Sequence, residues 1–493
     1  MITRYEDARI AEIWKDERRL AHWQDTELAV VQANEELGQF PRGTHLEIRT
    51  ALENAPIDIA WWYARDKEIR HDLNAFLDER RQYLPVGLHR YFHENITSYD
   101  TEEPAFMKML KQSCEVVEEM VHDLVPTLKV LALKHRYTIM NGRTHGQEAE
   151  LQTFGKRCLT WLRTLGESAT AFYAAQDGLK YAKISGAIGN YGSINPAVER
   201  RALELLGFEP FYGATQILPR ELHLPLAGAL LQISLSLEKI ALDIRLGARS
   251  GRPIYHEPFS RKQKGSSAMP HKKNTIFSEN IQGMARLARG YFDAIRENVV
   301  TWEERSIEQS SVERVAWPDL FHVLTFALKR MNTVLTGLVV YPDHMLQEIV
   351  ELRGCYASSE AKEFLKREGV SFGIDGETGY RIVQLAAFNV FEPSANMKEI
   401  RETVNHSLAE ADALLEKYRG EESIPLSIRE IIERGDLRRT DELDISKEEV
   451  ERWNEILRMV FSAAEARERW RRIFTAGYLL KNEATLYQEI LQQ

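Results

Sequence analysis

The stretch from Gly265 to Asn274 holds the residue types best suited to chemistry. It reads GSSAMPHKKN and combines a flexible glycine, two hydroxyls, a proline and two lysines. Asn274 stands directly before a helical pattern, so we expect it to be the N-cap of that helix. Hydroxyls, ammonium groups and free N–H groups of a helix N-terminus that meet in one place bind a carboxylate. On composition alone, a basic polar loop without a function is an equal alternative.

A second candidate is the histidine in the stretch NGRTHGQ, residues 141–147. A lone histidine is more often a hydrogen-bonded structural residue than a catalyst. His145, however, lies between Thr144 and Gly146. This setting indicates a loop position that a ligand can reach.

The elements that must position these residues are long helices. The chain has only 28 glycines and 16 prolines in 493 residues, and so few helix-breaking residues imply long uninterrupted elements. Several segments also show the apolar spacing of a helix. Each spans roughly 20 to 30 residues, longer than an average helix of about 11 to 12. Such helices with short connections predict a bundle, with the chemical residues in the breaks between them. The expected helices cover residues 105–135, 153–175, 222–249, 276–300 and 312–340.

We therefore predict an all-α fold of three helical domains, with a long central bundle. The expected domains are an N-terminal one at residues 1–100, the bundle with its catalytic loops at 101–348, and a C-terminal one at 349–493. The C-terminal part is more charged and more broken than the bundle. Within it, residues 419–446 have the composition of a mobile or surface insertion.

Composition and charge exclude several classes of function. The net charge of -10 disfavours binding to nucleic acid. The three cysteines show no CxxC spacing, which argues against structural zinc and disulfides and fits a reducing compartment. Charged residues near the N-terminus argue against a signal peptide. The most apolar long stretch, residues 222–244, contains Gln232, Glu238, Lys239 and Asp243, so we expect a buried bundle helix and no membrane span.

The stretch GSSAMPHKKN resembles the GSSxMPxKxN signature of the fumarase/aspartase superfamily. The resemblance implies that Ser266 is the catalytic base. It implies that Lys272 and Asn274 stabilise charge on the substrate carboxylate. Within the superfamily, GRTHGQ followed by TFGKR is similar to the adenylosuccinate lyases, where the histidine (here His145) is the general acid and Thr144 contacts the substrate.

Shorter matches to the same family run along nearly the whole chain. They imply a site for a nucleotide with a succinyl group, including its phosphate and carboxylates. Taken singly each match is weak, because a lone arginine more often forms a structural salt bridge. In chain order the implied substrate-binding residues are Arg4, Tyr5, Arg70, His71, Asp72, His93, Thr97, Ser98, Thr144, Gln216, Lys272, Asn274, Arg305, Ser310 and Arg314.

The resemblance implies a cytoplasmic homotetramer that releases fumarate from succinyl-purine nucleotides without a cofactor or metal. The sequence shows no HExxH, Walker or strand-linked GxGxxG motif. Another fumarate-releasing lyase, of the argininosuccinate type, and a non-catalytic homologue are the alternatives. The chain departs from the family at Thr275, where proline is usual. Threonine gives up the preset φ of proline at the start of a helix.

Overall fold

The computed structural model describes residues 1–269, 271–391, 426–440 and 443–492. These form two compact units. Unit 1 consists of Met1–Leu128, Trp161–Gly251 and Tyr255–Val339, and unit 2 of Lys129–Thr160, Arg252–Ile254 and Val340–Gln493. The all-α prediction is confirmed, because the described strands are short and pair only in twos. The three-domain division stays a prediction.

The helices of the first part of the chain are short apart from α2. An N-terminal 3-10 turn, η1 (Thr3–Tyr5), precedes them. Trp23, Trp62, Leu73 and Phe76 form a buried apolar cluster here. The elements are α1 (Ala8–Trp14), α2 (Asp16–Glu36), α3 (Thr44–Glu53), α4 (Ile59–Ile69), α5 (Asp72–Arg81) and η2 (Val86–Tyr91).

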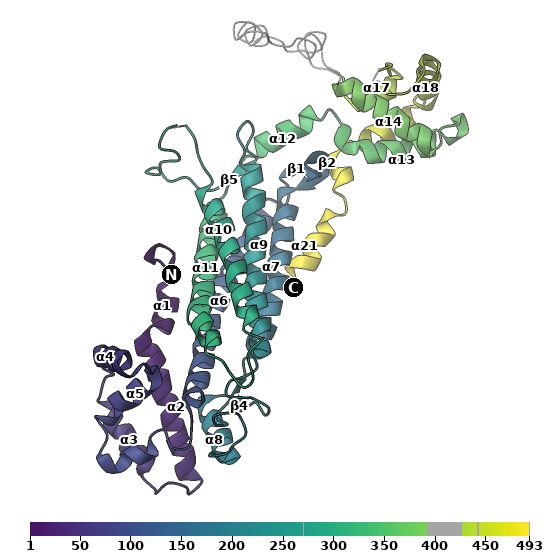
Figure 1. The fold of residues 1–493 in the computed structure, drawn as a ribbon. Coiled ribbons are helices and arrows are strands. Elements are labelled where there is room, and N and C mark those ends of the chain that lie inside the picture. Colours follow the sequence, from purple (N-terminus) through teal and green to yellow (C-terminus); the bar gives the residue numbers. More distant parts are fainter. Residues whose placement is uncertain (270, 392–425, 441–442, 493) are drawn as a thin grey trace. The chain divides into compact units, whose positions relative to one another are not determined.

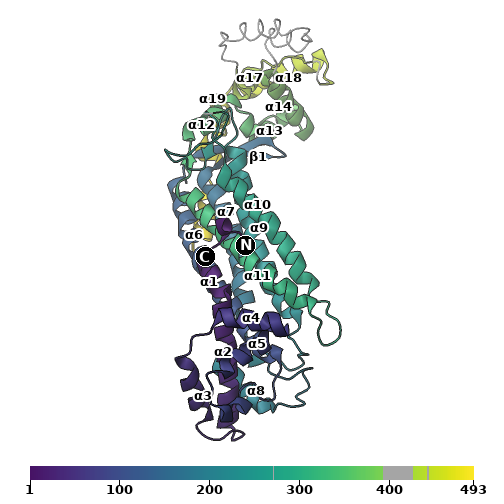
Figure 2. The same ribbon diagram turned by 60° about the vertical axis from the view of Figure 1, so that its left-hand side comes forward.

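The five expected long helices are all present, with bounds that differ from the predicted ones by a few residues, except at the start of α6, which begins seven residues early. Figures 1 and 2 show α9, α10 and α11 side by side, and these three pack on one another. The long helices are α6 (Ser98–Lys134), α7 (Phe154–Asp177), α9 (Leu224–Gly247), α10 (Ile276–Glu297) and α11 (Glu308–Thr336). Between them lie β3 (Tyr181–Ala182), α8 (Pro196–Leu206), β4 (Glu209–Pro210), η3 (Arg220–His223) and β5 (Tyr255–His256), and β6 (Val339–Val340) follows α11.

Helix α9 is a buried helix of the bundle, as predicted. With η3 it forms the one described helix that is long and apolar enough to cross a membrane. Half of the residues in its most apolar 18-residue segment are buried inside the protein. Leu226, Ile233, Leu237 and Ile244 are fully buried. Each such side chain stabilises the fold by about 1.5–3 kcal/mol. Three leucines on α9, at positions 235, 242 and 246, are instead 36–48% exposed.

A β-hairpin, β1 (Ile139–Thr144) and β2 (Gln147–Thr153), stands in unit 2 where only a loop was expected. The far end of β2 is fixed by the C-terminal helix α21 (Glu483–Leu491). The Glu483 carboxylate accepts hydrogen bonds from the Thr153 N–H at 3.1 Å and the Thr153 hydroxyl at 2.9 Å. The hairpin is therefore anchored by the last helix of the chain.

The rest of unit 2 is helical and has its own apolar core. Figure 1 shows α13, α14, α17 and α18 gathered together, around buried residues such as Phe364, Leu457 and Trp470. The elements are α12 (Pro342–Glu351), η4 (Cys355–Ala357), α13 (Ser358–Glu368), η5 (Val370–Phe372), α14 (Gly376–Phe391), α17 (Ile428–Arg434), α18 (Lys447–Val460), α19 (Ala464–Arg472), α20 (Ala476–Leu479) and α21.

The prediction of a mobile or surface insertion at 419–446 is wrong for its described part. Helix α17 begins with a capping box between Ser427 and Glu430 and buries Ile428, Ile431 and Ile432 in the apolar core. Its isoleucines at i, i+3 and i+4 form one apolar face, which the high charge of the stretch concealed. Residues 419–425 and 441–442 lie outside the described residues.

Candidate active site

The signature loop, residues 265–274, is closed on itself. The Asn274 side chain donates a hydrogen bond to the Gly265 carbonyl at 2.8 Å. A Cβ atom on Gly265 would lie 1.9 Å from the Lys272 carbonyl oxygen, so only glycine fits this crossing. Asn274 thus connects the two ends of the loop.

Ser266 lies inside this loop, and its side-chain oxygen faces backbone donors. The hydroxyl oxygen accepts hydrogen bonds from the N–H groups of Ala268 at 3.3 Å and Met269 at 3.1 Å. Donors aimed at an oxygen favour its charged form. Ser266 is partly buried, and Lys272, which lies in the same loop, is exposed. The loop therefore offers a hydroxyl whose oxygen already accepts two backbone hydrogen bonds.

The start of α10 differs from the expectation in two respects. Its N-cap is Thr275, not Asn274, and the Thr275 side chain makes no capping hydrogen bond. The Glu257 carboxylate accepts from the N–H groups of Phe277 and Ser278, both at 3.1 Å. The predicted free N–H groups are therefore occupied by a carboxylate of the chain itself. Burial nonetheless raises the pKa of Glu257, because it outweighs these donors.

His145 is at the tip of the β1–β2 hairpin. Thr144 pairs with Gln147, which leaves His145 and Gly146 as a two-residue turn with φ of 54° and 78°. Two positive φ values are the mark of a type I′ turn, which suits the twist of a hairpin. The imidazole is exposed. At the base of the tip, Arg143 forms an ion pair with Glu348 at 3.0 Å.

The histidine is not the only predicted site residue with a left-handed backbone. Arg70 has a φ of 56° and His93 a φ of 69°. Residues other than glycine adopt this conformation uncommonly, and it clusters at functional sites. The positive φ values thus give the three positions a property in common that the sequence does not show.

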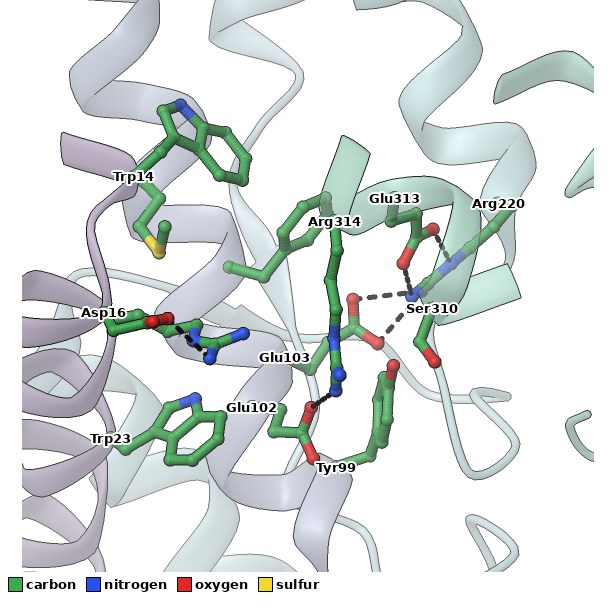
Figure 3. Close-up of a pocket in the computed structure, with 13 residues that line it drawn as sticks. Trp14, Asp16, Trp23, Tyr99, Glu102, Glu103, Arg220, Ser310, Glu313 and Arg314 are labelled. Carbon is green, nitrogen blue, oxygen red and sulfur yellow. Dashed lines mark hydrogen bonds and ion pairs between the residues drawn. The ribbon is translucent and has the colours of Figure 1, made fainter. Parts of the chain in front are cut away.

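A cavity of about 260 Å³ in unit 1 is lined by two of the predicted substrate-binding residues (Figure 3). Ser310 and Arg314 line it, and Arg314 forms an ion pair at 2.7 Å with Asp72, a third predicted residue. Both lie on α11, so the expectation that the chemical residues lie in breaks between helices is wrong here. Apart from Met109, the rest of the lining is aromatic or charged: Trp14, Asp16, Arg19, Trp23, Tyr99, Glu102, Glu103, Phe106, Arg220 and Glu313.

Arg305 and Gln216 contact each other beside this cavity. An Arg305 N–H group donates to the Gln216 side-chain oxygen at 2.9 Å. The Arg305 guanidinium also stacks 3.8 Å from the centre of the Tyr99 ring. The structure therefore brings two predicted residues from distant segments together.

A buried ion pair connects Gln216 to the start of α6. The fully buried Lys183 ammonium lies 2.6 Å from the Asp100 carboxylate, which is also fully buried. It donates further hydrogen bonds to the carbonyl oxygens of Gly186 at 3.0 Å and Gln216 at 3.1 Å. Asp100 in turn accepts from the Thr97 N–H at 2.9 Å. Lys183 thus ties together three segments, two of which carry predicted substrate residues.

His93 lies before α6 and contacts a buried carboxylate. Its Nδ1 is 2.8 Å from Glu27, which also accepts from the Thr101 hydroxyl at 2.6 Å. Burial disfavours the charged form of His93. The negative charge and the hydrogen bond of Glu27 outweigh this effect and raise the pKa of the imidazole. Ser98 begins α6.

The remaining predicted residues lie elsewhere. Arg4 lines a second hollow together with Arg9, Lys329 and Arg330, and Tyr5 packs edge-on against Phe326, with ring centres 5.0 Å apart. Neither lines the cavity of Arg314. His71 is the N-cap of α5, and its Nδ1 accepts from the Asn74 N–H at 3.3 Å. His71 and its neighbour Arg70 are exposed.

Comparison with known proteins decides the family. A lyase family profile matches residues 60–290. The chain is 37% identical to an adenylosuccinate lyase of Synechocystis sp. over 81% of this chain and 91% of the relative. It is 35% identical to one of Bacillus subtilis over 82% and 91%. The chain belongs to the adenylosuccinate lyase family. It is therefore a lyase.

Solved structures share the fold of this adenylosuccinate lyase family member. A β-carboxy-cis,cis-muconate cycloisomerase from Acinetobacter calcoaceticus has a TM-score of 0.75 at 18% identity, over 99% of this chain and 98% of that one. A fumarate lyase from Mesorhizobium sp. has a TM-score of 0.72 at 19% identity, over 96% and 99%. At these identities the likeness concerns the fold alone.

Sequence reasoning missed several polar residues around the site of this family member. Arg220 is buried and forms ion pairs with Glu103 at 2.9 Å and Glu313 at 2.7 Å; these carboxylates outweigh its burial and raise its pKa. Burial and the neighbouring carboxylates also raise the pKa of Tyr99. The partners are far apart in sequence, and no local motif signals them. Glu102 and Lys183 were missed for the same reason.

Proposed function

We propose that the chain is a cytoplasmic adenylosuccinate lyase that cleaves adenylosuccinate to AMP and fumarate. It also cleaves the succinyl-aminoimidazole-carboxamide ribonucleotide, and it needs no cofactor or metal. The names of the relatives and the identity over most of their length support this substrate class. The cavity with Ser310 and Arg314 supports it too, since an arginine and a hydroxyl suit a phosphate.

The proposed reaction is a β-elimination. The deprotonated Ser266 oxygen removes a proton from the succinyl carbon next to a carboxylate. That electron pair becomes the carbon–carbon double bond of fumarate as the carbon–nitrogen bond breaks, and His145 donates a proton to the departing nitrogen. Lys272 and Asn274 stabilise the negative charge that builds up on the carboxylate. Ser266 acts as a base at neutral pH only if its own negative charge is stabilised.

The observation that carries the proposal is the pair of N–H groups directed at the Ser266 oxygen. The test is a direct assay of purified protein for fumarate release from both substrates. Ser266→Ala should lower kcat by about 10²- to 10⁴-fold, the usual contribution of a general base. Release of no fumarate from either substrate by folded protein would refute the proposal.

The second candidate is a lyase of the argininosuccinate type, whose substrate has no phosphate. AMP distinguishes the two, because a ligand that binds the folded state raises the melting temperature. We expect AMP to raise it and arginine to leave it unchanged. The reverse result would favour the second candidate, and no fumarate from any adduct would favour a non-catalytic homologue.

We further propose that four copies assemble through the long helices and that each active site draws residues from different copies. The three exposed leucines on α9 support this, because residues 235, 242 and 246 are spaced by seven and four positions and so lie on one helix face. An apolar stripe on a soluble helix marks a contact with another chain. Symmetric association of copies would bury it.

Mixing of two inactive variants tests the shared site. Ser266→Ala and His145→Ala proteins, each nearly inactive, are mixed, dissociated and reassembled at equal ratio. If the two residues of a site come from different copies, roughly a quarter of the wild-type activity returns, because about one site in four receives both intact residues. A tag on one parent confirms that mixed assemblies form. Mixed assemblies without activity would show that both residues come from one copy.

A further inference from the structure

Glu102 has an unusual place in the cavity of Arg314. It lies on α6, lines the cavity and has a side chain only 14% exposed. Within the part of the chain that the structure describes, its ion-pair partner is Arg314, at 3.9 Å. A buried carboxylate normally has several close donors. Glu102 is thus a carboxyl group that faces a ligand cavity and is poorly satisfied when ionised.

Arg314 is shared between two carboxyl groups. The same guanidinium nitrogen is 2.7 Å from Asp72 and 3.9 Å from Glu102, and Figure 3 shows the contact with Glu102. Asp72 is further fixed by the Leu73 N–H, which donates to it at 2.9 Å. Asp72 therefore forms the short, fixed ion pair with Arg314, whereas Glu102 forms only a long one.

The charged groups that face Glu102 come from every element around it. Asp72 lies on α5, Arg314 on α11, Arg305 just before α11, and Arg19 on α2. Burial and the negative charge of Asp72 outweigh the three arginines and raise the pKa of Glu102 to about 8. Asp16 on α2, and Tyr99 and Glu103 on α6, line the same cavity. Near neutral pH, Glu102 therefore holds a proton.

We propose that Glu102 couples the binding of a phosphate group at Arg314 to the uptake of one proton by the enzyme. This rests on the proposed function, in which Ser310 and Arg314 bind the phosphate of the nucleotide. An ionised Glu102 competes for Arg314 and repels a phosphate dianion. A protonated Glu102 no longer competes for Arg314, and it offers an O–H that can donate to a phosphate oxygen. By taking up a proton, Glu102 thus removes one negative charge from a partly acidic cavity that binds an anionic ligand.

The coupling between AMP binding and proton uptake appears as a pH dependence of the affinity for AMP. Above the pKa of the free enzyme, the binding of AMP must bring one proton with it, so the affinity falls by up to about tenfold for each unit of pH. The phosphate does not cause this fall, because its second pKa is about 6 and it is already a dianion at pH 8. Glu102→Gln, which is permanently neutral, removes the dependence and binds AMP more tightly than the wild type at pH 9.

The test is calorimetric titration of AMP into the full-length protein at pH 8.5, in two buffers with different enthalpies of ionisation. The wild type should take up between half a proton and one proton for each AMP bound, and Glu102→Gln should take up markedly fewer. The matched control is Glu308→Gln, because Glu308 is an exposed glutamate at the start of α11 that does not line the cavity. It should behave as the wild type.

The outcomes separate the inference from the proposed function. If AMP does not bind the wild type, the proposed function fails. If AMP binds the wild type without proton uptake at pH 8.5, the role of Glu102 is refuted, whether or not the variant folds. Equal uptake by the wild type and Glu102→Gln also refutes it, since the proton would then go to another group.

Discussion

Lys183→Met is the substitution whose effect the structure defines best. Lys183 and Asp100 are both fully buried and lie 2.6 Å apart. Methionine fills much of the same space but leaves the Asp100 carboxylate without its counter-charge. Removing one partner of a buried pair costs about 3–5 kcal/mol, because the other charge stays buried. Unit 1, where both residues lie, has about 300 residues. At about 2.1 cal/mol/K per residue, the loss lowers Tm by roughly 5–8 °C.

The paired variant gives the sharper test. Lys183→Met/Asp100→Asn removes both charges of this pair, and asparagine keeps an oxygen for the N–H groups of Thr97 and Gly186. We expect the double variant to be more stable than Lys183→Met by at least about 1 kcal/mol, a coupling of the size found for residues in contact. Urea unfolding of the wild type, both single variants and the double variant measures it. Additive losses would refute the reasoning, as would a loss below about 1 kcal/mol for Lys183→Met alone.

Two further predictions concern the signature loop. Thr275→Pro should stabilise the protein by up to about 1 kcal/mol without loss of activity, because Thr275 has a φ of -83° and its N–H donates to no other described residue. Thermal unfolding checks this, and a lower Tm would show that proline does not fit there. Gly265→Ala should lower kcat by at least about 10²-fold with little change in Tm, because a Cβ would force the loop away from the Lys272 carbonyl. Its control is Gly283→Ala on α10, where a Cβ meets nothing within 4 Å, and equal activity of the two variants would contradict the prediction.

The long helices could be predicted from the sequence because their apolar spacing is strong and few breakers interrupt it. The start of α11 could not, since its first residues, EQSSVER, are polar and show no apolar period. The hairpin was missed for a related reason. Its strands, IMNGRT and QEAELQT, lack clear alternation, and Gly142 interrupts the first one at an irregularity in the pairing.

The site could be predicted only where its residues are close in sequence. The resemblance pointed to Asp72 and Arg314 separately, but their pairing joins positions 242 residues apart. The same holds for Lys183, which lies 83 residues from Asp100. A buried carboxyl such as Glu102 looks in the sequence like an ordinary charge on a helix surface. Burial and the partners of a charge depend on the fold, and no local pattern encodes them.

The contact that anchors the β1–β2 hairpin has a consequence for the synthesis of the protein on the ribosome. Thr153 and its partner Glu483 are separated by 330 residues. A ribosome that adds about 5–20 residues each second needs roughly 20–60 s to make the chain between them. Throughout that interval α21 has not yet been made, so the end of β2 lacks its anchor, although the residues of both strands and of the turn with His145 have already been synthesised. Because an isolated two-stranded hairpin is at best marginally stable in water, we expect the end of β2 to become fixed only after this last nine-residue helix has emerged.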